Sequence, residues 1–282
     1  MRPHPTIAMI ILVLLMGINA SSQSYDARRI DEFGDLNSES ATARLQNAVM
    51  ELAIRLEKYP DAMLHFVYHR VGNQPIGEPY RRLAIHRAYL DAAKYDLKRV
   101  LFSVCEPGQG SPTEIWLLDS RSVERTCSPE EFNPPESTRF VTTYAPNYKY
   151  ALGGCCLIDE VGYSASMEVV KAFGKWLIAH PTTTGYVVLY GGTNVYGFSI
   201  PPGPQRMVRR VDPPSFVARL RNDVRKYLNS VGVTKSRVTL INGGYRDTYA
   251  SIDLWIVPPG AKRPIAKPDY FPRPKQKLKR NR

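Results

Sequence analysis

Two pairs of adjacent glycines, each at the end of an expected strand, are the residues in this sequence best suited to bind an anion. Gly191-Gly192 follows an aromatic strand, and the second pair opens the run Gly243-Gly244-Tyr245-Arg246. Glycine lets backbone amides approach an anionic group closely, and a neighbouring arginine adds positive charge. The alternative is that these glycines serve tight turns that need a positive φ. The candidate ligand residues in this part of the chain are Gly191, Gly192, Gly244, Tyr245 and Arg246.

Side chains capable of catalysis are present, but their spacing does not predict an active site. Asp31-Glu32 and Asp159-Glu160 are adjacent pairs on expected strands, where neighbouring residues point to opposite faces. His65 and His69 can share one strand face, but such a pair is more typical of structure than of metal binding. The sequence contains no Gly-x-Ser-x-Gly motif. We therefore expect no catalytic residues, no metal and no cofactor, with a hydrolase built from dispersed residues as the alternative.

Residues 1–22 have the pattern of a cleavable secretory signal peptide. The apolar run Ile7 to Gly17 follows Arg2 and His4 and precedes small residues at positions 20–22. A bilayer span needs roughly 20 apolar residues, so this run is too short, and an uncleaved anchor is the less favoured alternative. The cleavage region has no cysteine that could carry a lipid. We expect a secreted or periplasmic protein with no transmembrane segment after signal removal.

Four cysteines in an exported chain predict disulfides, because the compartment is oxidising. They are Cys105, Cys127, Cys155 and Cys156. Of the three possible pairings, a Cys155-Cys156 bridge needs a strained ring because adjacent Cα atoms lie too close together. We therefore favour Cys105 and Cys127 each bonded to one member of the adjacent pair. A metal site is disfavoured because there is no Cys-x-x-Cys motif and no histidine at ligand spacing.

The elements that must position these residues occur twice in the chain. Ile30-Asp31-Glu32-Phe33-Gly34 returns as Ile158-Asp159-Glu160-Val161-Gly162. Each copy continues with a helix ended by a proline, an aromatic-rich strand, a second helix, an Arg-Val pair and a strand centred on tryptophan. The paired markers are Pro60 and Pro181, Arg99-Val100 and Arg237-Val238, and Trp116 and Trp255. Repetition on this scale predicts one structural unit used two times.

Each unit is expected to run strand–helix–strand–helix–strand–strand. Strands separated by helices require crossover connections and a sheet with helices packed on it. The fold class is therefore α/β (α+β), with two tandem units whose helices pack on a mixed sheet. Strand alternation places Trp116 and Trp255 opposite their flanking residues. We expect one sheet face to meet the helices and the other to be partly open, with the units packing through their open faces or joined by a flexible connector.

Composition sets the expected boundaries. The first unit covers 23–120, a connector rich in proline and acids covers 121–150 with one short strand expected near Phe140 to Tyr144, and the second unit covers 151–260. A basic, proline-rich tail over 261–282 is expected to be disordered and extended. From Lys262 onward nine basic residues outnumber one acid, so the tail holds +8 of the chain's net charge of +12. Anionic lipid or an acidic cell-wall polymer is an accessible partner for such a tail, and a merely solubilising tail is the alternative.

Several motifs resemble the OmpA-like domain, the peptidoglycan-binding module of bacterial outer-membrane proteins. The second unit carries Gly232-Val233-Thr234-Lys235-Ser236-Arg237-Val238, then Gly243-Gly244-Tyr245, then a closing strand from Ile252 to Val257. The first keeps Arg81-Arg82-Leu83-Ala84. The resemblance covers roughly residues 28–120 and 155–260. It implies two OmpA-like β-α-β-α-β-β units and assigns Arg82 to the family's ligand-binding helix arginine.

The chain departs from the family where the ligand binds. The family places an aspartate in a Thr-Asp-x-x-Gly loop, whereas the loops here read His69-Arg70-Val71-Gly72 and Gly192-Thr193-Asn194-Val195. In the second unit only Arg219 or Arg221 lies near the arginine position. We expect an exported, non-enzymatic binding or structural module of the bacterial cell envelope, binding peptidoglycan or another anionic polymer and no nucleic acid. A protein-interaction module is the alternative, together with the hydrolase.

Overall fold

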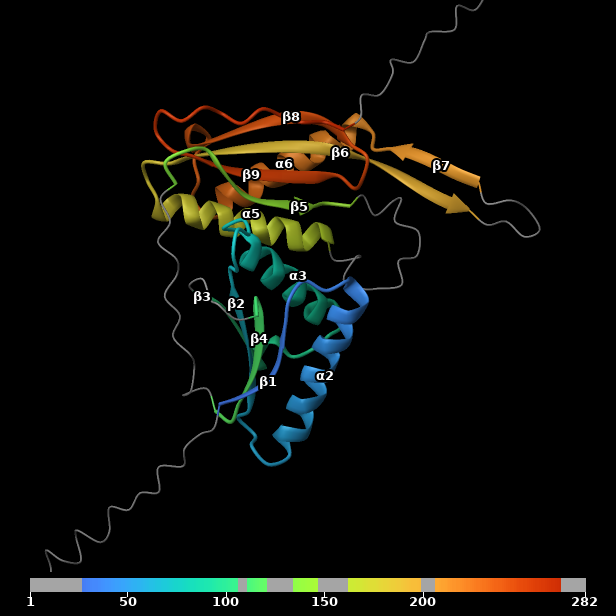
Figure 1. Ribbon diagram of the computed structural model, residues 1–282, viewed down its shortest axis with the longest axis vertical. Coiled ribbons are helices and arrows are strands. Elements are labelled where there is room, and N and C mark those ends of the chain that lie inside the picture. Colours follow the sequence, from blue (N-terminus) through green and yellow to red (C-terminus); the bar gives the residue numbers. More distant parts are fainter. Residues whose placement is uncertain (1–26, 106–110, 121–133, 147–161, 199–205, 270–282) are drawn as a thin grey trace, which may run out of the picture.

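The protein consists of two α/β units stacked against each other, seen in a computed structural model (Figure 1). The structure describes residues 27–105, 111–120, 134–146, 162–198 and 206–269. Each unit has a mixed sheet with two helices packed against it. This arrangement confirms the predicted fold class of two tandem α+β units.

The first unit is a four-stranded sheet with the strand order β1-β4-β2-β3. Strands β2 and β3 are parallel, and β4 lies antiparallel between β1 and β2. Helices α2 and α3 cover one face, where Leu45, Phe66 and Leu90 are fully buried in the core. The elements are β1 (Arg28–Phe33), α2 (Ser38–Leu56), β2 (Met63–His69), α3 (Glu78–Ala92), a 3-10 turn (Leu97–Arg99), β3 (Val100–Cys105) and β4 (Thr113–Leu118).

The second unit repeats this topology with the strand order β5-β9-β6-β8. Its one addition is a ribbon in which the end of β6 pairs with β7 and extends beyond the sheet (Figure 1). Helices α5 and α6 bury Phe173, Leu177 and Leu220 on the same sheet face. The elements are β5 (Thr138–Tyr144), α5 (Gly162–Ala179), β6 (Thr184–Phe198), β7 (Arg206–Val211), α6 (Pro214–Ser230), a 3-10 turn (Lys235–Arg237), β8 (Val238–Arg246) and β9 (Ser251–Val257).

Details of the two units match residue by residue. Arg29 lies opposite Trp116 just before a register shift in the β1–β4 pair, and Arg139 lies opposite Trp255 just before the same shift in β5–β9. In both units the guanidinium lies over the indole, at 6.0 Å and 5.8 Å from the ring centroid. The two tryptophans therefore occupy equivalent positions in their sheets and stack with equivalent arginines, although within the described residues only the Trp116 indole N–H donates a hydrogen bond, to Glu114.

The Arg-Val pairs are equivalent as well. Arg99 donates to the carbonyl of Pro60, and Arg237 donates to the carbonyls of Leu177, His180 and Thr183. Both arginines thus tie down the loop that follows the first helix of their unit. The sequence repeat is a structural duplication.

The second unit begins earlier than predicted. The short strand expected within the connector is present as β5, but it belongs to the second unit, where it pairs with β9 and occupies the place that β1 has in the first unit. Gly162 was expected to end a strand and instead begins α5. The repeated Asp-Glu motif therefore does not mark equivalent strands, and Asp159-Glu160 lies outside the described residues.

The units meet through helices and not through open sheet faces, so that expectation was wrong. Helix α3 packs along α5 and against β5. Gly77, which precedes α3, donates its N–H to the carbonyl of Phe140 at 2.8 Å, and Tyr80 stacks on the Phe140 ring at 5.9 Å between centroids. Phe140 is fully buried in the core of the second unit. One aromatic side chain of β5 therefore joins the two cores.

Replacing Gly77 with alanine should destabilise this junction. An added Cβ would lie 2.4 Å from the Phe140 ring, which is buried and cannot swing aside. Overpacking of this kind costs about 1–3 kcal/mol of unfolding free energy, measurable by urea denaturation. Gly34→Ala is the matched control because a Cβ there meets nothing within 4 Å. Equal stability of the two variants would contradict the proposed contact.

The chain after β9 is ordered to Asp269, which corrects the prediction of a disordered tail from 261 onward. Lys267 donates its backbone N–H to the Tyr190 hydroxyl, and Asp269 donates its own to the Tyr245 carbonyl, both at 3.0 Å. These two bonds hold the segment on the sheet, which composition alone does not reveal. The remainder, 270–282, lies outside the described residues, as does the predicted signal peptide.

Candidate functional site

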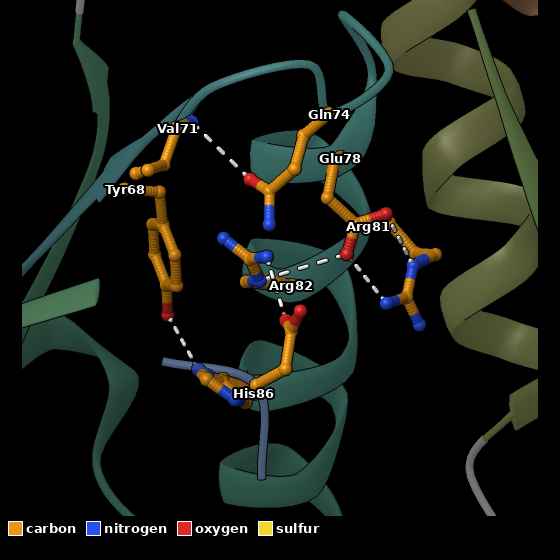
Figure 2. A network of polar contacts seen from close by, with 8 residues as sticks. Tyr68, Val71, Gln74, Glu78, Arg81, Arg82 and His86 are labelled. Atoms are coloured by element: carbon orange, nitrogen blue, oxygen red, sulfur yellow. Dashed lines mark hydrogen bonds and ion pairs between the residues drawn. The ribbon is translucent and has the colours of Figure 1, made fainter. Parts of the chain in front are cut away.

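A cluster of polar side chains is buried in the first unit between the end of β2 and the first turns of α3 (Figure 2). Tyr68 comes from β2, and Glu78, Arg82 and His86 come from successive turns of α3. Asp35 comes from the loop between β1 and α2. Residues four apart on a helix share a face, so α3 aligns its three members in one row.

Arg82 is the centre of this cluster. Its side chain is only 7% exposed, its Nη2 donates to Asp35 Oδ1 at 2.7 Å, and its Nε lies 3.5 Å from Glu78 Oε1. Within the described part of the chain, the buried Nη1 has no hydrogen-bond partner. Asp35 is 72% exposed, and Glu78 is also paired with Arg81, whose Nε donates at 2.9 Å. The buried guanidinium therefore keeps one nitrogen, Nη1, for another acceptor, beside an accessible carboxylate.

Tyr68 and His86 form the neutral side of the cluster. Tyr68 Oη and His86 Nδ1 share a hydrogen bond of 2.9 Å. Burial, with the nearby Arg82 and Arg81, lowers the pKa of His86 from 6.5 to about 3. Burial also raises the pKa of Tyr68 well above its ordinary value, against the opposing effect of Arg82. Both groups are uncharged at neutral pH, so Arg82 is the cation of the site.

The loop before α3 closes the cluster from above in Figure 2. Val71 donates its N–H to Gln74 Oε1 at 3.2 Å, and Gly72 takes a positive φ of 55°. Gly77 provides no side-chain cap, and the first N–H groups of α3 are bound within the protein: Gly77 donates to the Phe140 carbonyl and Glu78 to the Pro75 carbonyl. The partial positive charge of a helix N-terminus favours an anion close by.

The second unit has the same backbone but none of this polar chemistry. Because Arg99 and Arg237 are equivalent, each residue of α3 corresponds to the residue of α6 that lies the same number of positions before its arginine. Residues on and beside the strands are matched by their distance from equivalent positions in the two sheets. The pairs are Asp35 and Ala145, Tyr68 and Leu189, Glu78 and Phe216, Arg82 and Leu220, and His86 and Val224. All five counterparts are buried apolar residues. The fold therefore does not need the polar cluster, and Arg82 has no equivalent arginine in α6.

Of the predicted ligand residues, only Arg82 belongs to this cluster, and the other five lie in the second unit. Arg246 is committed to Asp253, to which its Nη2 donates at 2.7 Å, and it stacks over Tyr190 at 3.9 Å. The Gly192 N–H donates to Asp212 Oδ2 at 2.8 Å. These groups are bound to other residues of the second unit, and the structure does not bring them together with Arg82.

The glycines of the second unit serve close packing. A Cβ on Gly191 would lie 2.6 Å from the Tyr245 ring, and a Cβ on Gly192 would lie 2.5 Å from the Ala250 nitrogen. Gly244 has a positive φ of 91°, as the turn alternative requires, but it lies at a register shift within β8 and not at a turn. The sequence pattern thus reflects a requirement for space at these positions.

The histidines of β2 lie on the sheet face opposite the helices. His65 Nε2 shares a hydrogen bond of 2.8 Å with Ser103 Oγ, and His69 Nε2 lies 3.7 Å from Glu114. No group of three or more potential metal ligands occurs among the residues that the structure describes. Cys105 is buried at the end of β3, and the other three cysteines lie outside the described residues, so their pairing remains a prediction.

Asp35, Tyr68, Glu78 and His86 were not predicted, because the cluster forms only where the loop before α2, strand β2 and helix α3 come together. One available signal was the contrast between the copies: Arg82 and His86 are polar where the second helix of the other copy has Leu220 and Val224. Among the described residues, no helix is both long and apolar enough to span a membrane. No family model matches the chain, and no curated protein shows significant similarity to it.

Proposed function

We propose that the protein is an exported, non-enzymatic binding module that attaches to an anionic polymer of the bacterial cell envelope through Arg82. One observation carries the proposal: Arg82 and the four polar residues grouped around it in the first unit correspond to five buried apolar residues in the duplicate. Burying charge and polar groups in a position that apolar residues fill equally well costs stability. A ligand explains why the first unit retains them.

The site favours a carboxylate as the bound group. A guanidinium recognises carboxylates through paired N–H donors, and burial strengthens the contact because water does not compete. Arg82 Nη1 is the buried donor without a partner among the described residues, and the start of α3 adds a favourable field. An incoming carboxylate would occupy that donor while Asp35 stays on Nη2.

Asp35 extends the recognition to a neighbouring ammonium group. It is exposed, although it pairs with Arg82, so its second oxygen can accept from a cation in solution. The OmpA-like family places its acid in the loop after the second strand, where this chain has none. Asp35 offers the acid from a different loop. Together the two residues suit a zwitterionic group of the kind found in cell-wall peptides.

Binding to isolated peptidoglycan tests the proposal. The full chain should co-sediment with it, and Arg82→Leu should abolish binding because leucine has no donor. Arg87→Leu is the matched control, since it removes the same charge from an exposed position on the same helix. Binding should persist in 0.5 M salt for the wild type, because exposed charges are screened but a buried contact is screened far less.

Two results would contradict the proposal. If Arg82→Leu binds as the wild type does, the cluster is not the site. If all binding disappears in high salt for every variant, the basic C-terminus attaches the protein by electrostatics alone. Arg82→Leu should remain folded, because leucine occupies the same position in the second unit and Glu78 keeps Arg81 as its partner.

A further inference from the structure

The chain beyond β9 forms a strap, residues 258–269, that crosses the outer face of the second sheet. It turns at Gly260, whose φ is 78°, and the Ser137 hydroxyl donates to the carbonyl of Lys262. Farther along, Lys267 N–H donates to the Tyr190 hydroxyl and Asp269 N–H donates to the Tyr245 carbonyl. The contacts run from the residue before β5, over β6, to β8. The strap is therefore held by hydrogen bonds near both of its ends.

The strap lies on a core that is already complete. Its residues alternate between partly buried and exposed, with Pro264, Ala266 and Pro268 turned toward the protein and Ile265 83% exposed. No strap residue belongs to the buried core of the described chain. A segment held by few contacts at the surface opens at lower free energy than the core beneath it. The strap thus resembles a peptide docked on the surface, and it is not a strand of the sheet.

The surface under the strap is preformed. Tyr190 is 1% exposed, and its ring is held by the Arg246 guanidinium, which Asp253 fixes in turn. Gly243 leaves room for the Tyr190 ring, because a Cβ there would lie 2.5 Å from it. Gly244 leaves room for Pro268, which a Cβ would approach to 3.1 Å. Residues of the sheet therefore hold the Tyr190 ring and leave the space that Pro268 fills.

Aromatic hydroxyls, backbone acceptors and shallow space for proline rings are features of surfaces that bind extended proline-rich peptides. Proline lowers the entropy lost when such a peptide is ordered. Here the inward prolines at 264 and 268 bracket the Lys267 N–H that reaches Tyr190. The segment and the surface fit each other in both chemistry and spacing.

We infer that this face of the second sheet is a docking site for the C-terminal segment, and that it accepts the segment of a second copy in place of its own. The identical segment presents the same donors and prolines, and exchange of identical elements is an inexpensive route to a dimer. Gly260 supplies the hinge. The inference stands independently of the Arg82 site, which lies in the other unit.

A labelled synthetic peptide with the sequence of residues 258–269 tests the inference on the full chain. The receiving chain carries Pro264→Gly and Pro268→Gly to weaken its own strap. Fluorescence anisotropy should show saturable binding, at least about tenfold tighter than to the wild type, whose tethered strap competes at millimolar effective concentration. Adding Tyr190→Phe to the receiving chain should weaken the binding.

The matched control is the same peptide with both prolines replaced by glycine, which keeps every charge. Equal binding of that peptide would reduce the effect to electrostatics and overturn the inference, as would the absence of saturable binding. A second measurement uses the unmodified chain. Excess wild-type peptide should accelerate hydrogen exchange at the Lys267 and Asp269 amides, and unchanged protection would show that the strap is a permanent part of the fold.

Discussion

Gly192→Ala is expected to lower the unfolding free energy by at least about 3 kcal/mol, at the upper end of overpacking effects. The new Cβ would lie 2.5 Å from the Ala250 nitrogen and 2.6 Å from the Thr248 carbonyl oxygen. Both atoms belong to the backbone of the turn between β8 and β9, so no side chain can rotate to make room. The Gly192 N–H is also bound to buried Asp212, which prevents β6 from moving away.

Urea denaturation of Gly192→Ala against Gly34→Ala measures this effect. Gly34 follows β1, and a Cβ there meets nothing within 4 Å, so its substitution should change stability by less than about 0.5 kcal/mol. A Gly192→Ala protein as stable as the control would mean that the turn does not rest on β6. The result would then restore Gly192 as a candidate for ligand contact.

His86 should make the protein sensitive to acid between pH 6.5 and about 3. In the unfolded chain this histidine binds a proton near its ordinary pKa, whereas in the folded state burial lowers the pKa to about 3. Below pH 6.5 the unfolded state therefore holds more protons, so the free energy of unfolding falls as the pH falls. The loss approaches about 1.4 kcal/mol per pH unit for one group, and it ends near the folded pKa.

A comparison of Tyr68→Phe with the double variant Tyr68→Phe/His86→Val isolates this contribution. Both lack the Tyr68 hydroxyl, so neither leaves it buried without its partner, and valine is the residue at the equivalent position in the second unit. Chemical denaturation across the pH range should give a steeper acid decline for the variant that keeps His86. Parallel curves would show that the imidazole is protonated in the folded state and that the cluster is more open to water.

The repeat and the order of elements were predictable because apolar periodicity, prolines and paired markers are local in sequence. The equivalent positions of Trp116 and Trp255 confirm that prediction. A short strand near 140–144 was expected, but its place in the second sheet was missed because the stretch around it is rich in proline and acids. Its partner β9 is distant in sequence, and pairing across that distance leaves little trace in local composition.

The candidate site divides in the same way. Arg82 was predicted because the sequence around it resembles a family motif. Asp35, Tyr68 and His86 lie near it only because a loop, a strand and a helix come together in the folded chain. Conversely, Gly191, Gly192 and Arg246 have the residue types of an anion site. The two glycines are packed tightly against neighbouring atoms, and the Arg246 guanidinium is bound to the Asp253 carboxylate. Residue type indicates what a group can do, and its neighbours decide whether it is available.

From the sequence alone came the duplication, the helix and strand pattern of each unit and the basic C-terminus, because each depends on residues close together in the chain. Only the tertiary structure decided that the units meet through α3 and α5, that the C-terminal segment lies on a sheet, and that one of the two units buries a polar cluster beside its apolar core. These features depend on contacts between residues far apart in sequence. Local propensity cannot encode such contacts, because burial and partner choice are set only when the whole chain is packed.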